Sequence, residues 1–183
     1  MIVKAGVETL KETLDKILGE GADVTLVRDI KKAIASNDKV HGAYDLILHN
    51  YGPDSYMGSV HIAVDDTLSI NELDDVSREI HNDIMKQFNI NLTAIGIYSV
   101  NTSDEEADRI KKTIEKAVVA HEYVNQMHGF YYNPIKKELS LDIVVSLSAK
   151  DRRKVHNEVI AELKEMYPEF NIRVGLDADF NEI

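Results

Sequence analysis

The chain has 183 residues, of which 44% are hydrophobic, and a formal net charge of −11, so it can form one ordinary core or two small ones. The acidic balance argues against nucleic acid as a partner, because phosphate binding needs a surplus of lysine and arginine. The absence of cysteine excludes disulfides, thiolate zinc sites and cysteine nucleophiles. No stretch approaches the roughly 18 apolar residues of a membrane span and no signal peptide is recognisable, so we expect the fragment to be soluble.

Residues 1–21 are predicted to form an N-terminal helix that ends at Gly19 and Gly21. No capping residue precedes Ile2, and the apolar periodicity begins at Met1, as it would in a longer helix cut at this point. A truncated longer helix and a simple N-terminal helix both remain open. The apolar positions, which recur at helical intervals, are Val3, Val7, Leu10, Leu14 and Ile17.

Residues 22–100 are predicted to fold as helix, strand, strand, helix, strand. Asp23 caps the first helix, and a Gly-Pro-Asp turn at residues 52–54 joins two strands in which apolar and polar residues alternate. Ser69 precedes the second helix, and Asn89 ends it before the last strand, residues 92–100. The residues expected on the buried helix faces are Val27, Ile30 and Ile34, and then Leu73, Val76, Ile80, Ile84 and Phe88.

Residues 101–183 repeat this order. Ser103 or Asp104 caps a helix, residues 127–131 echo residues 40–44, and Gly175 matches Gly96. A repeat of about 80 residues is typical of a duplicated small domain. We therefore predict an α+β fold of two tandem αββαβ ferredoxin-like open-faced sandwich units, preceded by the N-terminal helix. Each unit is expected to have a three-stranded antiparallel sheet with two helices on one face.

Helices on one face leave the other face of each sheet in need of a partner or water. By strand parity, Ile47, His49, His61 and Ala63 fall on this open face of the first unit. Such a mixed surface suits self-association, so we expect a homodimer through the exposed sheet face. The second unit could enlarge that contact, or it could pair with the first unit inside one chain.

No nucleotide-binding, nucleophile-elbow or metalloprotease motif is present, so the sequence indicates no enzyme. Most histidines fall on helix surfaces or, like His41 and His128, at the start of a strand, where a structural role is expected. His61 differs, because it interrupts the strongest strand on its open face, and Asp142 takes its place in the second unit. This position favours a divalent ion shared by His61 with carboxylates from the same or another subunit.

The stretch GPDSYMGSVHIAVDDTLSINELDDVSREI resembles the cytoplasmic C-terminal domain of the cation diffusion facilitator (cation efflux) family. The opening VKAGVETLKETLDKILGE resembles the end and continuation of that family's last membrane helix. The resemblance implies a metallochaperone-like fold for residues 22–100, whereas residues 101–183 are an addition to the family's usual single tail domain and are assigned mainly from the internal repeat. It also implies a homodimeric tail of an integral cell-membrane protein that exports divalent cations such as zinc or manganese in exchange for protons.

The family's metal ligands are carried over position by position. His61 matches the histidine of the second strand, whereas Tyr44, Asp74, Gly96 and Tyr98 replace other family ligands. In the second unit, Asp142 and Asp177 stand where the family has its second-strand histidine and last-strand aspartate. The resemblance thus predicts His61, Asp142 and Asp177 as metal ligands, and the carboxylates suit manganese or magnesium better than zinc.

Two functions follow from these patterns. The first is a cytosolic regulatory and homodimerisation domain of a divalent cation efflux transporter, whose partner is the membrane part of the same chain and whose transport site lies there. The second is a free-standing ferredoxin-like sensor of a small ligand or metal, since tandem units of this kind bind ligands between paired sheets.

Overall fold

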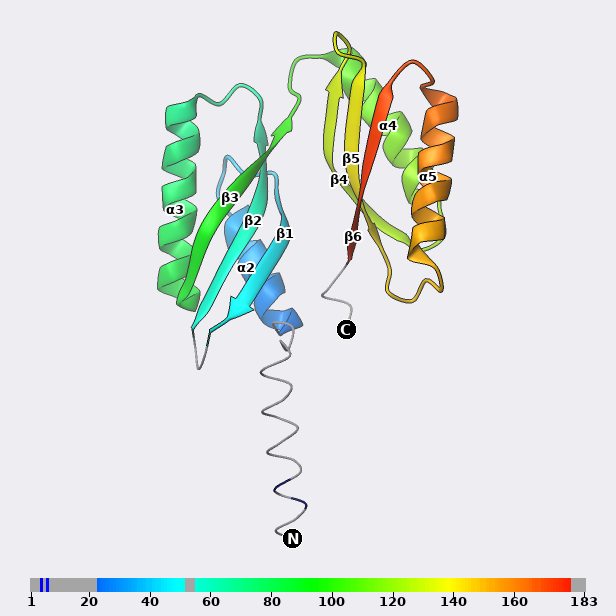
Figure 1. Cartoon of the computed structure of the whole chain (residues 1–183). Coiled ribbons are helices and arrows are strands. Elements are labelled where there is room, and N and C mark those ends of the chain that lie inside the picture. The colour runs from blue at the N-terminus through cyan, green and yellow to red at the C-terminus, as the bar shows by residue number, and fades with distance from the viewer. Residues whose placement is uncertain (1–3, 5, 7–22, 52–54, 179–183) are drawn as a thin grey trace.

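A computed structural model describes residues 4, 6, 23–51 and 55–178, which fold as two αββαβ units in tandem (Figure 1). The predicted helix over residues 1–21 lies outside the described residues, apart from Lys4 and Gly6. The first unit consists of α2 (Val24–Ala35), β1 (Gly42–Asn50), β2 (Tyr56–Asp65), α3 (Ile70–Phe88) and β3 (Ile90–Val100). The second unit consists of α4 (Glu105–Val119), β4 (Val124–Asn133), β5 (Glu138–Val145), α5 (Arg152–Met166) and β6 (Asn171–Ala178).

Each unit contains one three-stranded sheet with its middle strand second in sequence, in the orders β1-β2-β3 and β4-β5-β6. The tandem α+β fold predicted from the sequence is confirmed, but the expectation of purely antiparallel sheets is wrong. β1 runs antiparallel to β2, whereas β2 and β3 are parallel, and the second unit repeats this arrangement. The reason is the 19-residue helix α3 between β2 and β3, because a helical crossover returns the chain to the same end of the sheet.

The helices begin and end at the residues that their sequence signals indicate. The side chain of Asp23 accepts hydrogen bonds from the backbone N–H groups of Thr25 and Leu26 at the start of α2. Ser69 and Glu72 form a reciprocal capping box at the start of α3. Asn89 ends α3 in the left-handed conformation, with φ of 55°.

The helices of each unit cover one face of its sheet and enclose a separate core. In the first unit, the predicted Val27, Ile30, Ile34, Val76, Ile80 and Ile84 are buried, and Leu73 and Phe88 are partly buried against them. Val60, Ile62 and Val64 of β2 complete this core, so their neighbours Ser59, His61 and Ala63 face the other way. The second unit builds its core in the same manner from β5, α4 and α5.

An irregularity in β1 changes which side chains reach the open face. The pairing of β1 with β2 shifts between Tyr44 and Ile47, and Asp45 adopts a positive φ of 51°. β4 has the same shift between His128 and Tyr131, with Gly129 at φ of 60°. The strand pairing therefore makes Tyr44 the counterpart of His128. The sequence echo, which aligned His41 with His128, is off by three residues.

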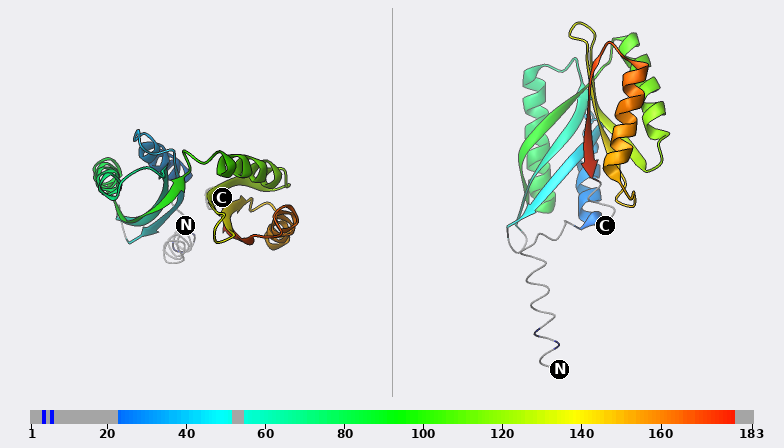
Figure 2. Two further views of the ribbon diagram at one scale, coloured as in Figure 1. Left: turned by 90° about the horizontal axis from the view of Figure 1, so that it is seen from above. Right: turned by 45° about the vertical axis from the view of Figure 1, so that its right-hand side comes forward.

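The open faces of the two sheets are turned toward each other. In Figures 1 and 2, α3 lies on the outer side of the first unit, α5 lies on the outer side of the second, and the sheets stand between them. Of the two arrangements that the sequence left open for the second unit, the structure shows the pairing inside one chain. As a consequence Ala63, expected on an uncovered surface, is only 6% exposed, while Ile47 remains 48% exposed and His49 is also exposed.

Candidate metal centre

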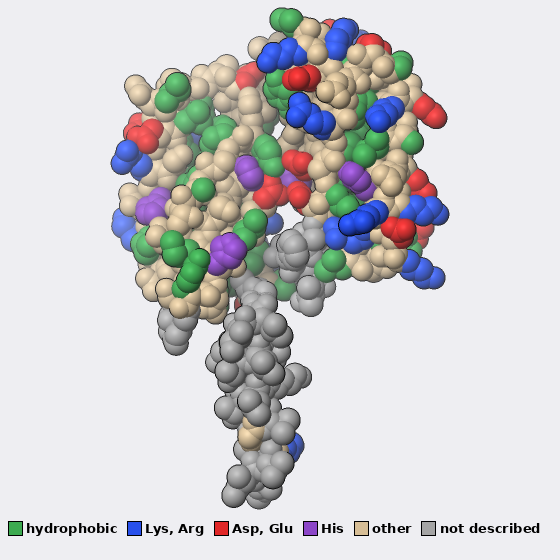
Figure 3. Space-filling model, in the orientation of Figure 1, with side chains coloured by type: hydrophobic (Ala, Val, Ile, Leu, Met, Phe, Trp, Pro, Cys, Tyr) green, Lys and Arg blue, Asp and Glu red, His purple; other side chains and the backbone are tan. Residues whose placement is uncertain are grey.

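Charged and aromatic side chains from both open faces meet between the units and form what we call the inter-unit cluster. In the space-filling view, acidic and histidine side chains gather where the two units approach each other (Figure 3). The cluster contains three residues from each unit, and contacts of Asp45 with His128 and of Tyr98 with Asp142 join the two sets. Its members are Asp45, His61 and Tyr98 from the first unit and His128, Asp142 and Asp177 from the second.

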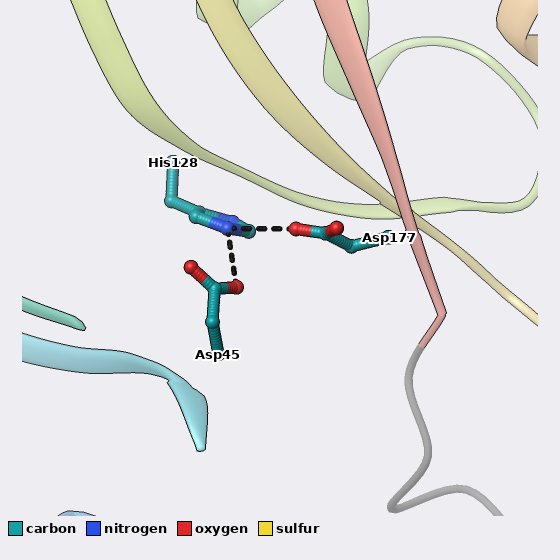
Figure 4. Close-up of side chains that lie close together, drawn as sticks. All are labelled: Asp45, His128 and Asp177. Carbon is teal, nitrogen blue, oxygen red and sulfur yellow. Dashed lines mark hydrogen bonds and ion pairs between the residues drawn. The ribbon is translucent and has the colours of Figure 1, made fainter. Parts of the chain in front are cut away.

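His128 lies at the centre of the cluster, between carboxylates of both units (Figure 4). Its Nε2 is 2.9 Å from Oδ1 of Asp45 and 3.2 Å from Oδ2 of Asp177. The imidazole side chain is only 3% exposed, and its ring stacks on Tyr44, with ring centroids 5.1 Å apart and planes inclined by 11°. A single histidine thus links β4 and β6 of the second unit to β1 of the first.

Asp45 lies at the irregularity in β1, which brings Tyr44 onto the open face beside it. The backbone of Asp45 is left-handed, a conformation that aspartate tolerates better than most residues. One carboxylate oxygen, Oδ1, contacts His128, and the other, Oδ2, accepts a hydrogen bond of 2.7 Å from the hydroxyl of Tyr98. Nδ1 of His61 lies 3.0 Å from Oδ2. Asp45 is therefore the group shared by most of the cluster.

Tyr98 and Asp142 form the second link between the units. The Tyr98 hydroxyl lies 3.1 Å from Oδ2 of Asp142, and the Tyr98 ring stacks on His61, with centroids 4.7 Å apart. Glycines make room for these side chains on the last strand of each unit. A Cβ atom at Gly96 would overlap the His61 ring, and one at Gly175 would overlap the Asp142 carboxylate.

The cluster perturbs the ionisation of its members. Burial opposes ionisation of Asp45, but hydrogen bonds from His128 and Tyr98, together with nearby imidazole charge, outweigh it and lower the pKa of Asp45 to about 2. Burial also opposes protonation of His128, yet the hydrogen bond with Asp45 and the surrounding carboxylates raise the pKa of His128 above its ordinary value. Burial and the charges of Asp45 and Asp142 raise the pKa of Asp177.

Tyr98 stays protonated, since burial and its hydrogen bond to Asp45 raise the pKa of the phenol. Its hydroxyl is thus a permanent donor that cannot act as a metal ligand without losing its proton. Three carboxylates and two imidazoles gather in the cluster, so its acidic side chains outnumber its basic ones. A divalent cation is the simplest ligand that would neutralise this excess.

The donor atoms fit a divalent metal ion. Ligand atoms of Asp45, His128 and Asp177 all lie within 4.8 Å of one another. A tetrahedral ion about 2.1 Å from its ligands requires separations of roughly 3.4 Å, close to the 2.9 and 3.2 Å between Nε2 of His128 and the carboxylate oxygens of Asp45 and Asp177. Among the described residues, two buried side-chain atoms have no hydrogen bond: Nδ1 of His128, and Nδ1 of His61, which lies 3.0 Å from Oδ2 of Asp45 without hydrogen-bond geometry. One imidazole and two carboxylates suit zinc or manganese.

The predicted ligands lie in the same cluster but do not contact one another directly. Asp177 belongs to the group of three donors, whereas His61 contacts Asp45 and Asp142 contacts Tyr98. Their assignment as metal ligands remains a prediction. The pairing confirms that Asp142 stands in the place of His61, because each faces the glycine of the last strand.

Sequence reasoning missed Asp45 and His128. His128 was assigned a structural role at the start of a strand, whereas it is the most buried histidine in the described chain. His128 is the counterpart of Tyr44, which directly precedes Asp45 in the sequence. This position of Tyr44 was the signal from which both residues could have been found. Of the other histidines, His41 pairs with Asp65 on the surface, whereas His81 and His156 are partly buried and contact backbone carbonyls.

The sequence was compared with known proteins. Residues 22–95 match the family model described as the cytoplasmic domain of cation efflux proteins. The chain is also similar to Metal tolerance protein 2 of Oryza sativa subsp. japonica, with 33% identity over 89 residues, which is 49% of this chain. The aligned part spans 23% of the length of that protein. Asp45 and His61 lie inside the matched residues, and Tyr98 and the second unit follow them.

The helices of the described residues were also assessed for their ability to cross a membrane. None of them combines sufficient length with sufficient apolar content.

Proposed function

We propose that this chain is the cytosolic regulatory part of a divalent cation efflux transporter, because residues 22–95 match the family model of cation efflux protein cytoplasmic domains. In this proposal a membrane part of the same protein exchanges the cation for protons. The family is one of transporter domains rather than of enzymes. The observation that supports a regulatory role is the inter-unit cluster, because its donors come from both units.

A divalent cation bound by Asp45, His128 and Asp177 would hold the open faces of the two units together. It would replace the repulsion between the carboxylates with attraction to a common centre, and so favour the closed arrangement. A cation can regulate transport in this way if the membrane part is sensitive to the arrangement of its tail, since a ligand shifts an equilibrium by its differential affinity for two states. Zinc and manganese are the ions that the donor set suits best.

The first experiment measures cation binding by titration calorimetry with Mn²⁺ and Zn²⁺ on the 183-residue chain. We expect one ion per chain, and we expect Asp45→Asn or Asp177→Asn to weaken binding by about 100-fold or more, because each variant removes a direct ligand. Glu162→Gln is the matched control, since Glu162 forms a histidine–carboxylate pair of 2.6 Å with His121 outside the cluster. Absence of binding to the unaltered chain, or equal losses in the control, would refute the metal assignment.

We also propose that two chains associate through the part of the open face that the second unit leaves exposed. Ile47 and its structural counterpart Tyr131 are 48% and 46% exposed, and His49 is exposed on the same face of β1. Apolar side chains that remain exposed on an open sheet are typical of an association surface. The homodimer would then bring two inter-unit clusters together beneath the membrane.

Ile47→Glu tests this contact. We expect sedimentation velocity to show a shift from dimer to monomer, because a charge would be buried at the interface. Ile135→Glu is the control, since Ile135 is 93% exposed in the turn between β4 and β5 and lies off the open face. A dimer that persists in Ile47→Glu at the same concentration would exclude this surface.

The alternative function is a free-standing sensor, which is favoured by the cavity of about 540 Å³ between the two units. The genomic reading frame distinguishes the two proposals. An open frame that continues upstream through six apolar spans would support the transporter, and a frame that starts at Met1 would support the sensor.

A further inference from the structure

A cavity of about 540 Å³ opens between the units beside the inter-unit cluster. One wall is a single face of α2, the floor is formed by β1, and residues of the second unit close the opposite side. Much of the surface is apolar and includes Val24 and Ile47, two side chains that are 42% and 48% exposed. The described aliphatic residues that line it are Val24, Val27, Ala35, Ala43, Leu46, Ile47 and Val144.

Three cationic side chains line the α2 wall of this cavity. Arg28, Lys31 and Lys32 lie on the same face of the helix as Val24 and Ala35, because residues three and four apart in a helix are neighbours. Arg28 contacts Asp29 at 3.5 Å, whereas neither lysine forms an ion pair with another described residue. The chain as a whole has a net charge of −11. Two lysines without an ion pair to a described residue, at the rim of an apolar cavity, therefore form a locally positive site in an acidic protein.

The repeat supplies an internal comparison. Arg28-Asp29-Ile30-Lys31-Lys32 of α2 corresponds to Asp108-Arg109-Ile110-Lys111-Lys112 of α4, and Ala35 corresponds to Glu115. The counterpart face of α4 thus has acids at the positions of Arg28 and Ala35, and Lys112 is paired with Asp108 at 2.7 Å. The duplicated lysines thus lie beside the acids Asp108 and Glu115 on α4, but beside Arg28 and Ala35 on α2.

We propose that this cavity binds a small organic acid, a single carboxylate on an apolar body. The carboxylate lies at Lys31 and Lys32, and the apolar body occupies the space between α2, β1 and Val144 of the second unit. A monoanion fits better than a phosphate, because Asp45 and Asp177 also line the cavity and would repel a second negative charge. The ligand contacts both units, so it stabilises their closed arrangement independently of any cation.

Octanoate is a suitable probe, since it joins one carboxylate to a flexible apolar chain. Calorimetry is carried out on the metal-free 183-residue chain, and methyl chemical shifts of Val27 and Val144 report whether the probe enters the cavity. We expect Lys31→Glu/Lys32→Glu to weaken octanoate binding by about tenfold or more, because it replaces two attractive charges with two repulsive ones. Lys31→Gln/Lys32→Gln should weaken it less and guards against a loss caused by misfolding.

Lys111→Glu/Lys112→Glu is the matched control, because it makes the same change at the repeated positions of α4. The proposal predicts unchanged octanoate affinity in this control and much weaker binding of 1-octanol, which has the same body without the charge. It is overturned if the unaltered chain does not bind octanoate, if both double variants lose affinity equally, or if 1-octanol binds as well as octanoate. Since the experiment excludes metal, it is independent of the proposed cation site, which Mn²⁺ titration tests separately.

Discussion

At the scale of single residues, His128 is the side chain on which the contact between the units depends. It is almost completely buried and its Nε2 lies within 3.2 Å of carboxylates from both units. The neighbouring acids favour the protonated imidazole, whereas a metal ion requires the neutral one, so protons and cations compete for the same nitrogen. The charge state of His128 therefore affects both stability and cation affinity.

The stability of the metal-free chain should depend on pH in two windows. The pKa of His128 is raised, so its contribution is complete below the unfolded value of 6.5 and is lost as pH rises through the folded value. The pKa of Asp45 is lowered to about 2, so its contribution is present above the unfolded value of 3.8 and is lost as pH falls toward 2. We expect maximal stability between these windows, measured by urea unfolding across pH.

His128→Gln should flatten the loss of stability above pH 6.5, because it removes the group that titrates there. Retention of the full slope in this variant would show that another group is responsible. His41→Gln is the control, since His41 forms a histidine–aspartate pair on the surface with a side chain that is 53% exposed.

For Asp177 the predicted effect on stability is opposite in sign to that for Asp45, because the pKa of Asp177 is raised and that of Asp45 is lowered. The pKa of Asp177 is raised by burial and by neighbouring carboxylates, so its ionised form destabilises the metal-free fold at neutral pH. Asp177→Asn should therefore raise the melting temperature of the metal-free chain slightly, by the equivalent of less than about 1 kcal/mol, because the side chain is 40% exposed. The same variant should lose the stabilisation that Mn²⁺ gives to the unaltered chain. A lower melting temperature without metal would contradict the repulsion inferred here.

At the scale of secondary-structure elements, the last strand of each unit carries a glycine so that a side chain of the middle strand can lie over it. In β6 this glycine is Gly175, below Asp142, and in β3 it is Gly96, below His61. Neither Gly96 nor Gly175 has a positive φ. The glycine is therefore required to leave space for the neighbouring side chain, and not to allow an unusual backbone angle. The sheets are thus built to hold these groups on their open faces.

Gly175→Ala should displace the Asp142 carboxylate and reduce the free energy of unfolding by about 1–3 kcal/mol, the usual cost of overpacking. Chemical denaturation provides the measurement. Arg173→Ala, two residues earlier in β6 with a side chain that is 70% exposed, should change stability little. Equal stability of Gly175→Ala and the unaltered chain would mean that the carboxylate moves aside at no cost.

The same elements show how far sequence can predict this structure. The helices and their buried faces follow from periodicity and caps, as at Val27, Ile30 and Ser69, because these signals are local. The β1 irregularity at Asp45 was not predictable, since alternation places Tyr44 on the core face and no residue in the stretch marks the shift. That error concealed the equivalence of Tyr44 and His128, and with it the centre of the cluster.

At the scale of the whole molecule, duplication allows one chain to bring two open sheets together. The corresponding positions have diverged: Tyr44, His61 and Tyr98 in the first unit face His128, Asp142 and Asp177 in the second. A contact between identical units would have two equivalent sites, whereas this contact concentrates its carboxylates in one asymmetric cluster. The sequence predicted the repeat and part of the cluster, but the packing of the units depends on contacts between residues far apart in the chain, such as Asp45 and His128, which are 83 positions apart.

The most direct test of this account is the anomalous difference density of a crystal of the 183-residue chain grown with Mn²⁺. We predict one strong peak per chain, within bonding distance of Asp45 and Asp177 carboxylate oxygens and of Nε2 of His128. A peak elsewhere, or none at full Mn²⁺ exposure with the two open faces apart, would contradict the claim that a cation joins the two units.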